Sequence, residues 1–350
     1  MCGIAGFISH KYSKENGSRL KKAMILQNDR GNGLGAGYGA YGIFPVYKDF
    51  YAFHVMGETS FVIDEVTQYL KEHFWVAHKE EISIWDKVIQ DHPLFMRYFL
   101  QPKLSGEDIN PDDFVIDKVM HINTAINGAF IFSSGRNMGV FKGVGTPRDI
   151  YEFFRLDEYQ GHCWIGHNRF PTNTPGWWGG GGAHPFNLLG WSIVHNGEIS
   201  SYGINRRYLE SNHYLCTLQT DTEVAAYLLD LLIRRHGLSI GDAITVLAPP
   251  YWSSADRYTD TQERDRIIAL KVIYESAMLN GPFAILAGFD GGLFSITDNT
   301  KLRPMVVGNA DGYTYFASEV SALYEMEENL AEVTTPRAGQ PVIVYYQAEG

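Results

Sequence analysis

Apolar residues recur along the chain with two spacings, and each spacing predicts one kind of secondary structure. Short apolar runs, some interleaved with small residues, indicate strands over 3–9, 41–47, 50–57, 129–133, 139–142, 163–170, around 188–195, 283–289, 292–297, 303–308, 313–317 and 341–346. Apolar residues three or four positions apart indicate helices over 17–29, 64–74, 84–100 with a break at Pro93, 147–156, 222–235, 263–279 and 319–328.

These predicted strands and helices come in blocks and do not alternate strictly. Blocks of this kind favour antiparallel sheets with helices packed on them, which is an α+β architecture. The stretch 101–113 is rich in turn-forming residues and predicts a loop. No internal repeat or long linker divides the chain, so we expect one domain over residues 1–350, with an insertion at about 50–125.

Composition narrows the class of protein. The chain has 350 residues, of which 45% are hydrophobic and 14% aromatic, which is enough to bury a sizeable core. The formal net charge is −11 and no run of basic residues occurs, so a nucleic-acid partner is not indicated.

Cysteine usage and the N-terminus bear on the compartment. Three cysteines, Cys2, Cys163 and Cys216, are too few and odd in number for a disulfide framework, and no CxxC pair suggests a zinc or iron–sulfur site. No apolar run has the length of a signal peptide or a membrane span. We therefore expect a cytoplasmic protein without membrane contact.

Two stretches are unusually rich in glycine. Residues 30–39 contain spacings similar to a dinucleotide-binding fingerprint, but a polar helix end precedes them and a strand-like run follows, which is the wrong context. The glycines there suit a backbone that passes close to another element. Residues 174–182 form a second glycine-rich loop, and both stretches are candidates for a mobile loop over a binding site.

The chain begins Met1-Cys2-Gly3, and this position makes Cys2 a candidate nucleophile. Removal of Met1 would leave a free α-amine on the same residue as the thiol, and such an amine titrates roughly near pH 8, so it can act as a base. The alternative is a buried cysteine in an N-terminal strand.

Two polar stretches follow the predicted strand 163–170. In His167-Asn168-Arg169-Phe170-Pro171-Thr172-Asn173-Thr174, the guanidinium of Arg169 can hold a carboxylate with both arms, or it can form a surface ion pair. The next stretch, 183–187, contains His184.

Two further stretches carry candidate polar groups. Asn196 and Gly197 in the stretch 192–199 can supply two adjacent donors to an oxyanion, although Asn-Gly is also a common hairpin turn. Asp221 can bind an ammonium group, or it can simply cap the helix that it precedes.

Taken together, these motifs resemble a known family. The order MCGIAGF, HNRFPTNT, AHPF, VHNGEI, TDTE is similar to that of the class II glutamine amidotransferases, which are N-terminal-nucleophile hydrolases with a four-layer αββα sandwich. The block from Arg169 to HNGEI most resembles the amidotransferase domain of glutamate synthase. The tail segments 298–304 and 317–319 resemble later landmarks of the family, although Lys301 departs from its commoner pattern.

The resemblance implies a role for each candidate. Cys2 would be the nucleophile and its α-amine the base, while Asn196 and Gly197 would form the oxyanion hole. Arg169, helped by Thr172, would hold the α-carboxylate of L-glutamine. On the same basis, the α-ammonium of glutamine would pair with Asp221. His184 stands where the family often has Gln, and its role in substrate binding is left open.

The implied reaction releases ammonia from glutamine, and no acceptor domain is recognisable in the chain. We therefore expect the acceptor on a partner, most simply a flavin-dependent synthase subunit of glutamate-synthase type. FMN and iron–sulfur clusters would belong to that partner, and we expect no cofactor in this chain.

Three alternatives remain. The ammonia acceptor could be a phosphoribosyl or sugar-phosphate substrate. The chain could be a non-catalytic glutamine-binding subunit, which retention of Met1 would favour. An N-terminal-nucleophile hydrolase for another amide, such as a bile salt or penicillin, fits less well, because Arg169 and Asp221 suit the two charged ends of an amino acid.

Overall fold

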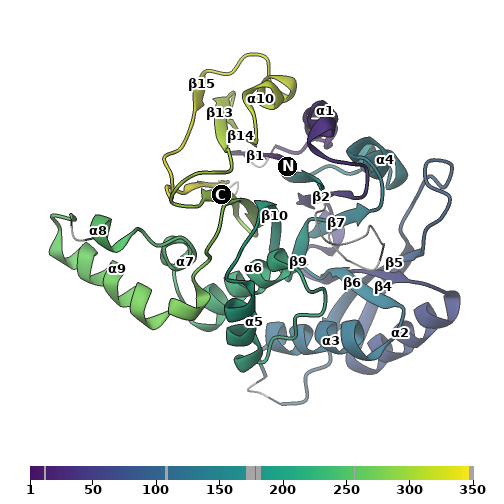
Figure 1. Cartoon of the computed structure of the whole chain (residues 1–350). Coiled ribbons are helices and arrows are strands. Elements are labelled where there is room, and N and C mark those ends of the chain that lie inside the picture. Colours follow the sequence, from purple (N-terminus) through teal and green to yellow (C-terminus); the bar gives the residue numbers. More distant parts are fainter. Residues whose placement is uncertain (12, 107–108, 171–177, 179–182, 256, 347–350) are drawn as a thin grey trace.

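The computed structural model describes residues 1–11, 13–106, 109–170, 178, 183–255 and 257–346. The central sheet is antiparallel throughout and places the N-terminal strand in its middle (Figure 1). Its strands, in spatial order, are β15 (Glu332–Thr334), β13 (Val306–Ala310), β14 (Tyr313–Ala317), β1 (Gly3–Ser9), β8 (Cys163–Asn168), β2 (Ala36–Tyr41) and β7 (Met138–Gly143).

A second antiparallel sheet packs face to face against the first. Its strands, in spatial order, are β16 (Val342–Tyr345), β12 (Gly292–Thr297), β11 (Phe283–Phe289), β10 (Trp191–Gly197) and β9 (Phe186–Leu188). The two sheets approach closely at Gly6 of β1, where an added Cβ would lie 2.8 Å from Cδ2 of Leu286 on β11. Ile4, Phe7, Val194 and Leu286 are fully buried in the core that both sheets share.

Helices cover the outer faces of both sheets. The first sheet is covered by α1 (Ser18–Leu26), α4 (Pro147–Phe153) and α10 (Val320–Met326), and the second by α6 (Asp221–Leu229) with α5 (Tyr202–Ser211) beside it. The helix α6 continues as a π-helical segment over Asp230–Arg235, which contacts α7 (Ile240–Leu247), and α8 (Trp252–Ala255) and α9 (Thr261–Ile273) follow. The fold is therefore α+β, as the pattern of the sequence predicts, with the four layers αββα that the family resemblance implies.

Residues 51–133 build a separate layer beside the sandwich, which we call the side lobe (Figure 1). Its antiparallel sheet has the spatial order β4 (Phe74–Glu81), β5 (Leu94–Pro102), β3 (Tyr51–Gly57) and β6 (Ala129–Ser133), and its helices are α2 (Ser60–His73) and α3 (Pro111–Ala125). That this segment is an insertion into a shared fold stays a prediction.

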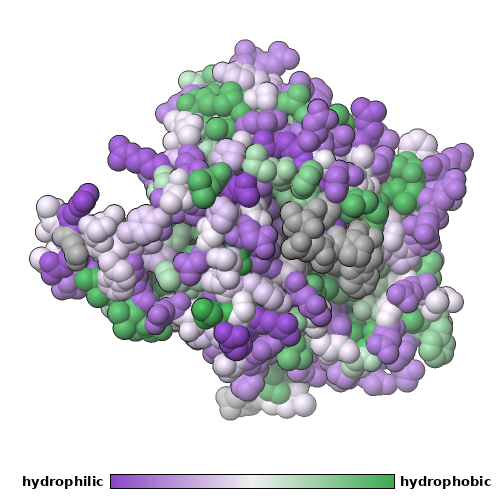
Figure 2. Space-filling model, viewed as in Figure 1, coloured by the Kyte–Doolittle hydropathy of each residue, from purple (hydrophilic) through white to green (hydrophobic). Residues whose placement is uncertain are grey.

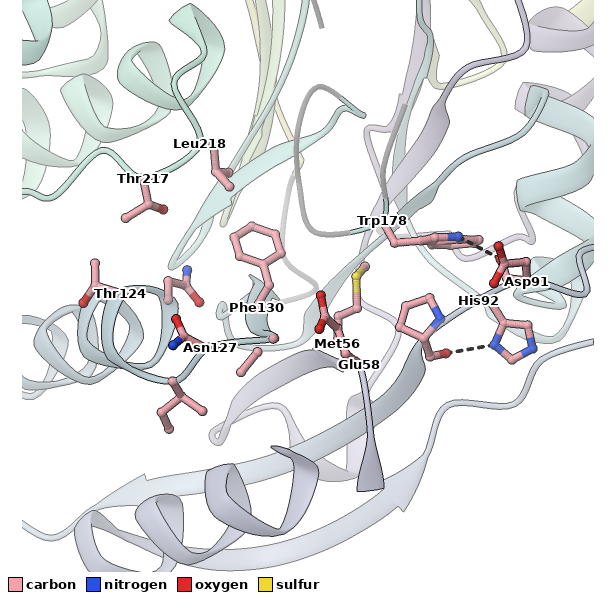
Figure 3. Close-up of a pocket in the computed structure, with 15 residues that line it drawn as sticks. Met56, Glu58, Asp91, His92, Thr124, Asn127, Phe130, Trp178, Thr217 and Leu218 are labelled. Carbon is pink, nitrogen blue, oxygen red and sulfur yellow. Dashed lines mark hydrogen bonds between the residues drawn. The ribbon is translucent and has the colours of Figure 1, made fainter. Parts of the chain in front are cut away.

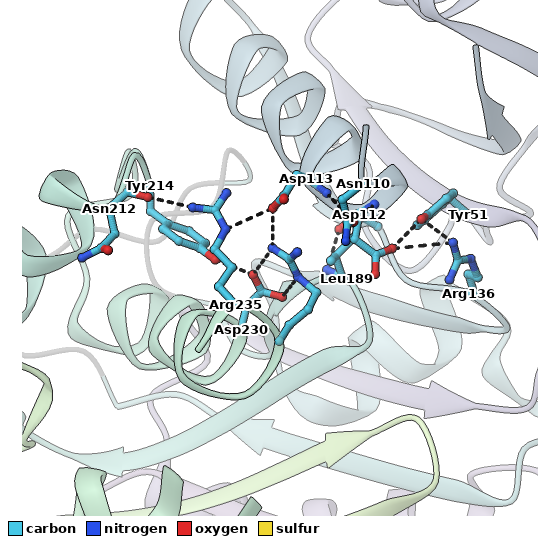
Figure 4. A network of polar contacts seen from close by, with 12 residues as sticks. Tyr51, Asn110, Asp112, Asp113, Arg136, Leu189, Asn212, Tyr214, Asp230 and Arg235 are labelled. Atoms are coloured by element: carbon cyan, nitrogen blue, oxygen red, sulfur yellow. Dashed lines mark hydrogen bonds and ion pairs between the residues drawn. The ribbon is translucent and has the colours of Figure 1, made fainter. Parts of the chain in front are cut away.

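An ion-pair network holds the side lobe against the helices of the sandwich (Figure 4). Asp113, in the first turn of α3, accepts from Arg234 at 2.9 Å and from Arg235 at 3.0 Å. Arg234 also pairs with Asp230, which is fully buried, at 2.8 Å. Because one guanidinium bridges a buried and a surface carboxylate, the orientation of α3 relative to α6 is defined by several bonds rather than one.

Three predictions from the sequence are wrong, and pairing between strands explains two of them. The predicted helix 84–100 is not formed, and its residues from Leu94 onward belong to β5, which pairs with β3 and β4 on either side. In the glycine-rich stretch 30–39, which we expected to be a loop, residues 36–39 belong to the buried strand β2. The predicted strand 41–47 is also wrong in part, because residues 45–47 form a 3₁₀ turn. An added Cβ on Gly37 would lie 2.1 Å from the carbonyl oxygen of His184, so these glycines do allow a close backbone approach.

Other differences are smaller. The helices α3, α5, α7 and α8 and the strands β4 and β15 were not predicted, and α3 begins inside the predicted loop 101–113. The glycine-rich loop 174–182 lies outside the described residues, except for Trp178. In the described part of the chain, no helix is both long and apolar enough to cross a membrane. Hydrophilic residues are spread over the face seen in Figure 2, with smaller hydrophobic patches between them.

Candidate active site

Cys2 lies at the start of β1, in the middle of the central sheet. Its sulfur accepts a hydrogen bond from the backbone N–H of Phe170 at 3.3 Å, because Gly3 pairs with Asn168 at the end of β8. The carbonyl oxygen of Cys2 accepts from Nε of Arg30 at 3.2 Å, and Arg30 pairs in turn with Glu319 at 3.3 Å. Both ends of the residue are therefore anchored to neighbouring elements.

The surroundings of Cys2 have opposing effects on its thiol. Burial raises the pKa of the Cys2 thiol above its ordinary value, and this is the largest effect. The Phe170 N–H, the N-terminal ammonium and the guanidinium groups of Arg169 and Arg303 act in the other direction and lower the pKa. The net shift is upward, so the thiol is protonated at neutral pH and needs a base before it can act as a nucleophile.

Arg169 follows β8 directly and is 5% exposed, so it is not the surface residue that one alternative required. Its backbone N–H donates to the carbonyl of Gly35 at 2.9 Å, and its side-chain Nη1 donates to the carbonyl of the neighbouring Leu34 at 3.4 Å. The thiol of Cys2 is within electrostatic range of its guanidinium. The predicted partner Thr172 lies outside the described residues.

Asn196 and Gly197 end the strand β10 and do not form a hairpin turn. They pair with Ala284 and Phe283 of β11. The side chain of Asn196 is 1% exposed, and its Nδ2 has no hydrogen-bond partner among the described residues. A buried amide donor without a partner is costly, so it indicates a place where a ligand oxygen binds.

Gly197 occupies a position that only glycine accommodates. Its φ is +142°, and an added Cβ would lie 2.0 Å from the carbonyl oxygen of Pro282. The chain turns sharply here, and the N–H of Glu198 donates to that same oxygen at 3.0 Å. The glycine therefore sets the direction in which the strand leaves the site.

Asp221 is the first residue of α6 and not its cap, which corrects the capping interpretation. The capping residue is Thr220, whose hydroxyl accepts from the N–H of Thr222 at 3.3 Å. Oδ2 of Asp221 accepts from the N–H of Ile199 at 2.9 Å, and Oδ1 lies 3.8 Å from Nδ1 of His195. This carboxylate is thus held beside the end of β10, close to Asn196.

His184 belongs to a buried group of three histidine rings. Its Nδ1 accepts from the backbone N–H of His195 at 3.1 Å, and its Nε2 lies 3.5 Å from the hydroxyl of Thr222. The ring stacks on His167 with centroids 3.8 Å apart. Burial, and then the neighbouring His167 and His195, hold the pKa of His184 well below its usual range, so the ring is neutral. Both nitrogens face protein groups, so the structure gives His184 a positioning role, and substrate binding by His184 stays a prediction.

One residue that sequence reasoning did not assign completes the group. Arg303 lies within the tail segment 298–304 and acts electrostatically on both Cys2 and His195. Its Nε is buried without a hydrogen-bond partner among the described residues. The tail motif was a visible signal for Arg303, but the motif alone does not indicate that the tail returns to the N-terminus.

The structure therefore brings the predicted groups together from five elements. Cys2, Arg169, Asp221 and His184 are linked through hydrogen bonds or electrostatic contacts that run through Phe170, Arg303, His195 and Thr222, and Asn196 follows His195 directly on β10. Among the described residues, no group of three or more metal-ligating side chains could hold a metal ion.

Two antiparallel sheets packed face to face, with a cysteine beginning a central strand, are the architecture of an N-terminal-nucleophile hydrolase. The model of the family "Glutamine amidotransferases class-II" matches residues 76–348. The chain therefore belongs to the class II glutamine amidotransferases and is an enzyme of that class.

Three relatives show the range of the family. An uncharacterised protein of Archaeoglobus fulgidus is 47% identical over 98% of this chain and 91% of its own length. The glutamine amidotransferase-like protein GlxB of Rhizobium meliloti is 28% identical over 60% of this chain. An amidophosphoribosyltransferase of Methanocaldococcus jannaschii is 25% identical over 58% of this chain. The matched region spans 59% of GlxB and 38% of the amidophosphoribosyltransferase.

Proposed function

We propose that Cys2, once Met1 is removed, opens the side-chain amide of L-glutamine. The α-amine takes the proton of the thiol, and the sulfur attacks the amide carbon to form a tetrahedral oxyanion. The protonated amine then gives its proton to the leaving nitrogen, and ammonia departs. Water hydrolyses the resulting γ-glutamyl thioester, which yields glutamate and restores the thiol.

The observation that carries this proposal is the environment of the sulfur. Cys2 accepts from the Phe170 N–H and lies within electrostatic range of Arg169 and Arg303. These cationic and N–H groups stabilise a thiolate, while burial keeps the resting thiol neutral. The unpaired Nδ2 of buried Asn196 supplies a donor for the oxyanion, and the Gly197 N–H is the second donor that the family resemblance implies.

The two charged ends of glutamine have candidate partners of opposite sign. Arg169, with Thr172 as its predicted helper, would bind the α-carboxylate through its planar guanidinium. Asp221 would bind the α-ammonium, and its side chain keeps 20% of its surface exposed although it already accepts from the backbone. This pairing selects a free amino acid over an acyl group without charges.

For the ammonia, we propose delivery to a partner synthase of glutamate-synthase type that carries FMN and iron–sulfur clusters. The resemblance of the stretch from Arg169 to HNGEI supports this choice. A phosphoribosyl acceptor is the second candidate, because one relative is an amidophosphoribosyltransferase. A regulatory subunit that binds glutamine without turnover is the third.

Two measurements test the proposal. Intact-mass analysis of the purified protein should give a mass that lacks Met1, and the same protein should release ammonia from glutamine, alone or with its partner. Retention of Met1 together with glutamine binding and no turnover would instead establish the regulatory alternative. Co-purification from the native host, followed by glutamine-dependent assays on the proteins recovered, should identify the acceptor.

A further inference from the structure

A cavity of about 480 Å³ lies where the side lobe meets the sandwich (Figure 3). Its apolar wall includes Met56, Phe130 and Trp178, which come from three separate parts of the chain. The opposite side is formed by the end of α3 and by Thr217 and Leu218. Among the described residues, none of those assigned to the glutamine site above lines this cavity.

Two carboxylates and one histidine, His92, are the titratable groups among the described residues that line the cavity. Glu58 and Asp91 line it, and neither carboxylate has an ion pair or a hydrogen bond with a described residue. Oε2 of Glu58 lies over the backbone at Gly128, 3.1 Å from where a Cβ would be. The described residues that line the cavity include no lysine or arginine.

The helix α3 adds a second, independent negative contribution. It has 15 residues and ends at Ala125, and the cavity is lined by Asn123, Thr124 and the capping residue Ile126. The C-terminal end of a helix carries partial negative charge from carbonyl groups, which favours a cation nearby. A ligand phosphate would face two carboxylates and this helix end, so the cavity disfavours phosphorylated molecules.

One wall of the cavity is tied to the start of α6. The backbone N–H groups of Thr217 and Leu218 both donate to the carboxylate of Glu223, at 3.0 and 2.9 Å. Glu223 is 1% exposed and lies two residues after Asp221 on the same helix. A ligand that moves 217–218 therefore acts on the helix turn that presents Asp221.

We propose that this cavity binds a small molecule with a positively charged amino group on an apolar body, and that its occupancy alters glutamine turnover. The negative charge of Glu58, Asp91 and the end of α3 attracts the amino group electrostatically, while Met56, Phe130 and Trp178 pack against the body, the indole also by cation–π attraction. The effect on turnover rests on the proposed function, whereas the binding does not.

The binding test uses two probes with the same aromatic body and opposite charge, 2-phenylethylammonium and 3-phenylpropionate. Calorimetry on the Cys2→Ala protein measures binding without any catalysis, so a failure here is separate from a failure of the proposed function. We expect the cation to bind and the anion not to bind. Equal or tighter binding of 3-phenylpropionate would overturn the proposal, as would the absence of binding by the cation.

Variants locate the site. Glu58→Gln and Asp91→Asn should each weaken binding of 2-phenylethylammonium about fivefold, which corresponds to one partly exposed charge pair. Glu65→Gln removes an exposed carboxylate from α2 of the same lobe, outside the cavity, and should leave binding unchanged. Wild-type affinity in both cavity variants would show that the probe binds elsewhere and would overturn the assignment.

The effect of cavity occupancy on glutamine turnover is measured by glutaminase kinetics of the wild-type enzyme. Saturating 2-phenylethylammonium should change kcat or KM for glutamine, and Glu58→Gln should need about fivefold more probe for the same change. Unchanged kinetics with the probe bound would refute the coupling.

Discussion

The sulfur of Cys2 lies 3.3 Å from the backbone nitrogen of Phe170, although 168 positions separate the two residues. Antiparallel pairing of β1 with β8 creates this contact, because it places the end of one strand beside the start of the other. The residue after Arg169 thereby supplies an N–H to the candidate nucleophile, and Arg169 itself is brought within range of the thiol.

We predict that Cys2 is the one thiol whose modification stops glutamine hydrolysis. Iodoacetamide should label Cys2 before Cys163 and Cys216, which are 0% and 6% exposed. Because burial raises the pKa of the Cys2 thiol, labelling should accelerate as the pH rises toward that pKa. Peptide mass mapping against residual activity measures both effects. Cys2→Ala should have no glutaminase activity, and loss of activity with Cys2 unlabelled would contradict the assignment.

Asn196→Ala should reduce kcat for glutamine roughly 100- to 1000-fold, the usual cost of losing one oxyanion donor. Glutamine should still bind, because the groups proposed for its charged ends are Arg169 and Asp221. Steady-state kinetics give the first quantity, and calorimetry in the Cys2→Ala background gives the second. Asn329→Ala, at an exposed position, is the control and should keep normal turnover. Unchanged turnover in Asn196→Ala would remove this residue from the oxyanion hole.

A pair of glycine substitutions separates backbone strain from a steric clash. Gly237 has φ +70° with no atom within 4 Å of an added Cβ, so Gly237→Ala should lower the free energy of unfolding by ~1 kcal/mol. Gly197→Ala adds a clash with the Pro282 carbonyl at 2.0 Å, and we expect ~3 kcal/mol or more. Denaturant unfolding compares the two variants. Equal losses would mean that β10 and the strand beside it can shift apart at Gly197.

His184 should act by positioning β10. In His184→Phe, the buried N–H of His195 loses its acceptor, which costs about 1–3 kcal/mol of stability. His184→Gln keeps an acceptor oxygen and should restore much of both stability and kcat. Thermal unfolding and glutaminase kinetics on both variants test this. If Gln and Phe are equally damaging and only KM for glutamine rises, His184 contacts the substrate instead.

The buried Lys142 should make stability depend on pH. Burial lowers the pKa of its ammonium to about 7, from 10.5, and its Nζ lies 4.3 Å from the Phe186 ring centroid. Between these two values the unfolded chain holds a proton that the folded protein does not, so stability should rise with pH, by at most about 1.4 kcal/mol per unit.

The matched variant for this effect is Lys142→Met, which keeps an unbranched side chain without the charge. Near neutral pH it should be at least as stable as the wild type, because a buried ammonium is replaced by an apolar group. Unfolding measured from pH 7 to 9 should then show a smaller rise than in the wild type. A parallel pH dependence in both proteins would mean that Lys142 keeps its proton in the folded state.

The candidate site was predictable to a large extent because its residues lie in short motifs at the ends of apolar strands. The run at 163–168 and the run at 192–197 both form strands, and candidate polar groups lie at the end of each strand. Where the tertiary structure disagreed, pairing decided the outcome. The stretch 84–100 predicts a helix in isolation, yet its residues from Leu94 onward belong to β5, where β3 and β4 flank them and satisfy their backbone groups as a strand.

By itself, the sequence determined most strands of the two packed sheets, the position of Cys2 ahead of the first strand, and the polar residues that follow the later ones. Only the tertiary structure decided that Asn196 and Gly197 belong to a paired strand, that Thr220 rather than Asp221 caps α6, and that Arg303 returns to Cys2. The physical reason is that a sequence motif specifies the side chains of only a few consecutive residues. Pairing across a sheet and packing between layers join residues far apart in the chain, and no local pattern encodes those distances.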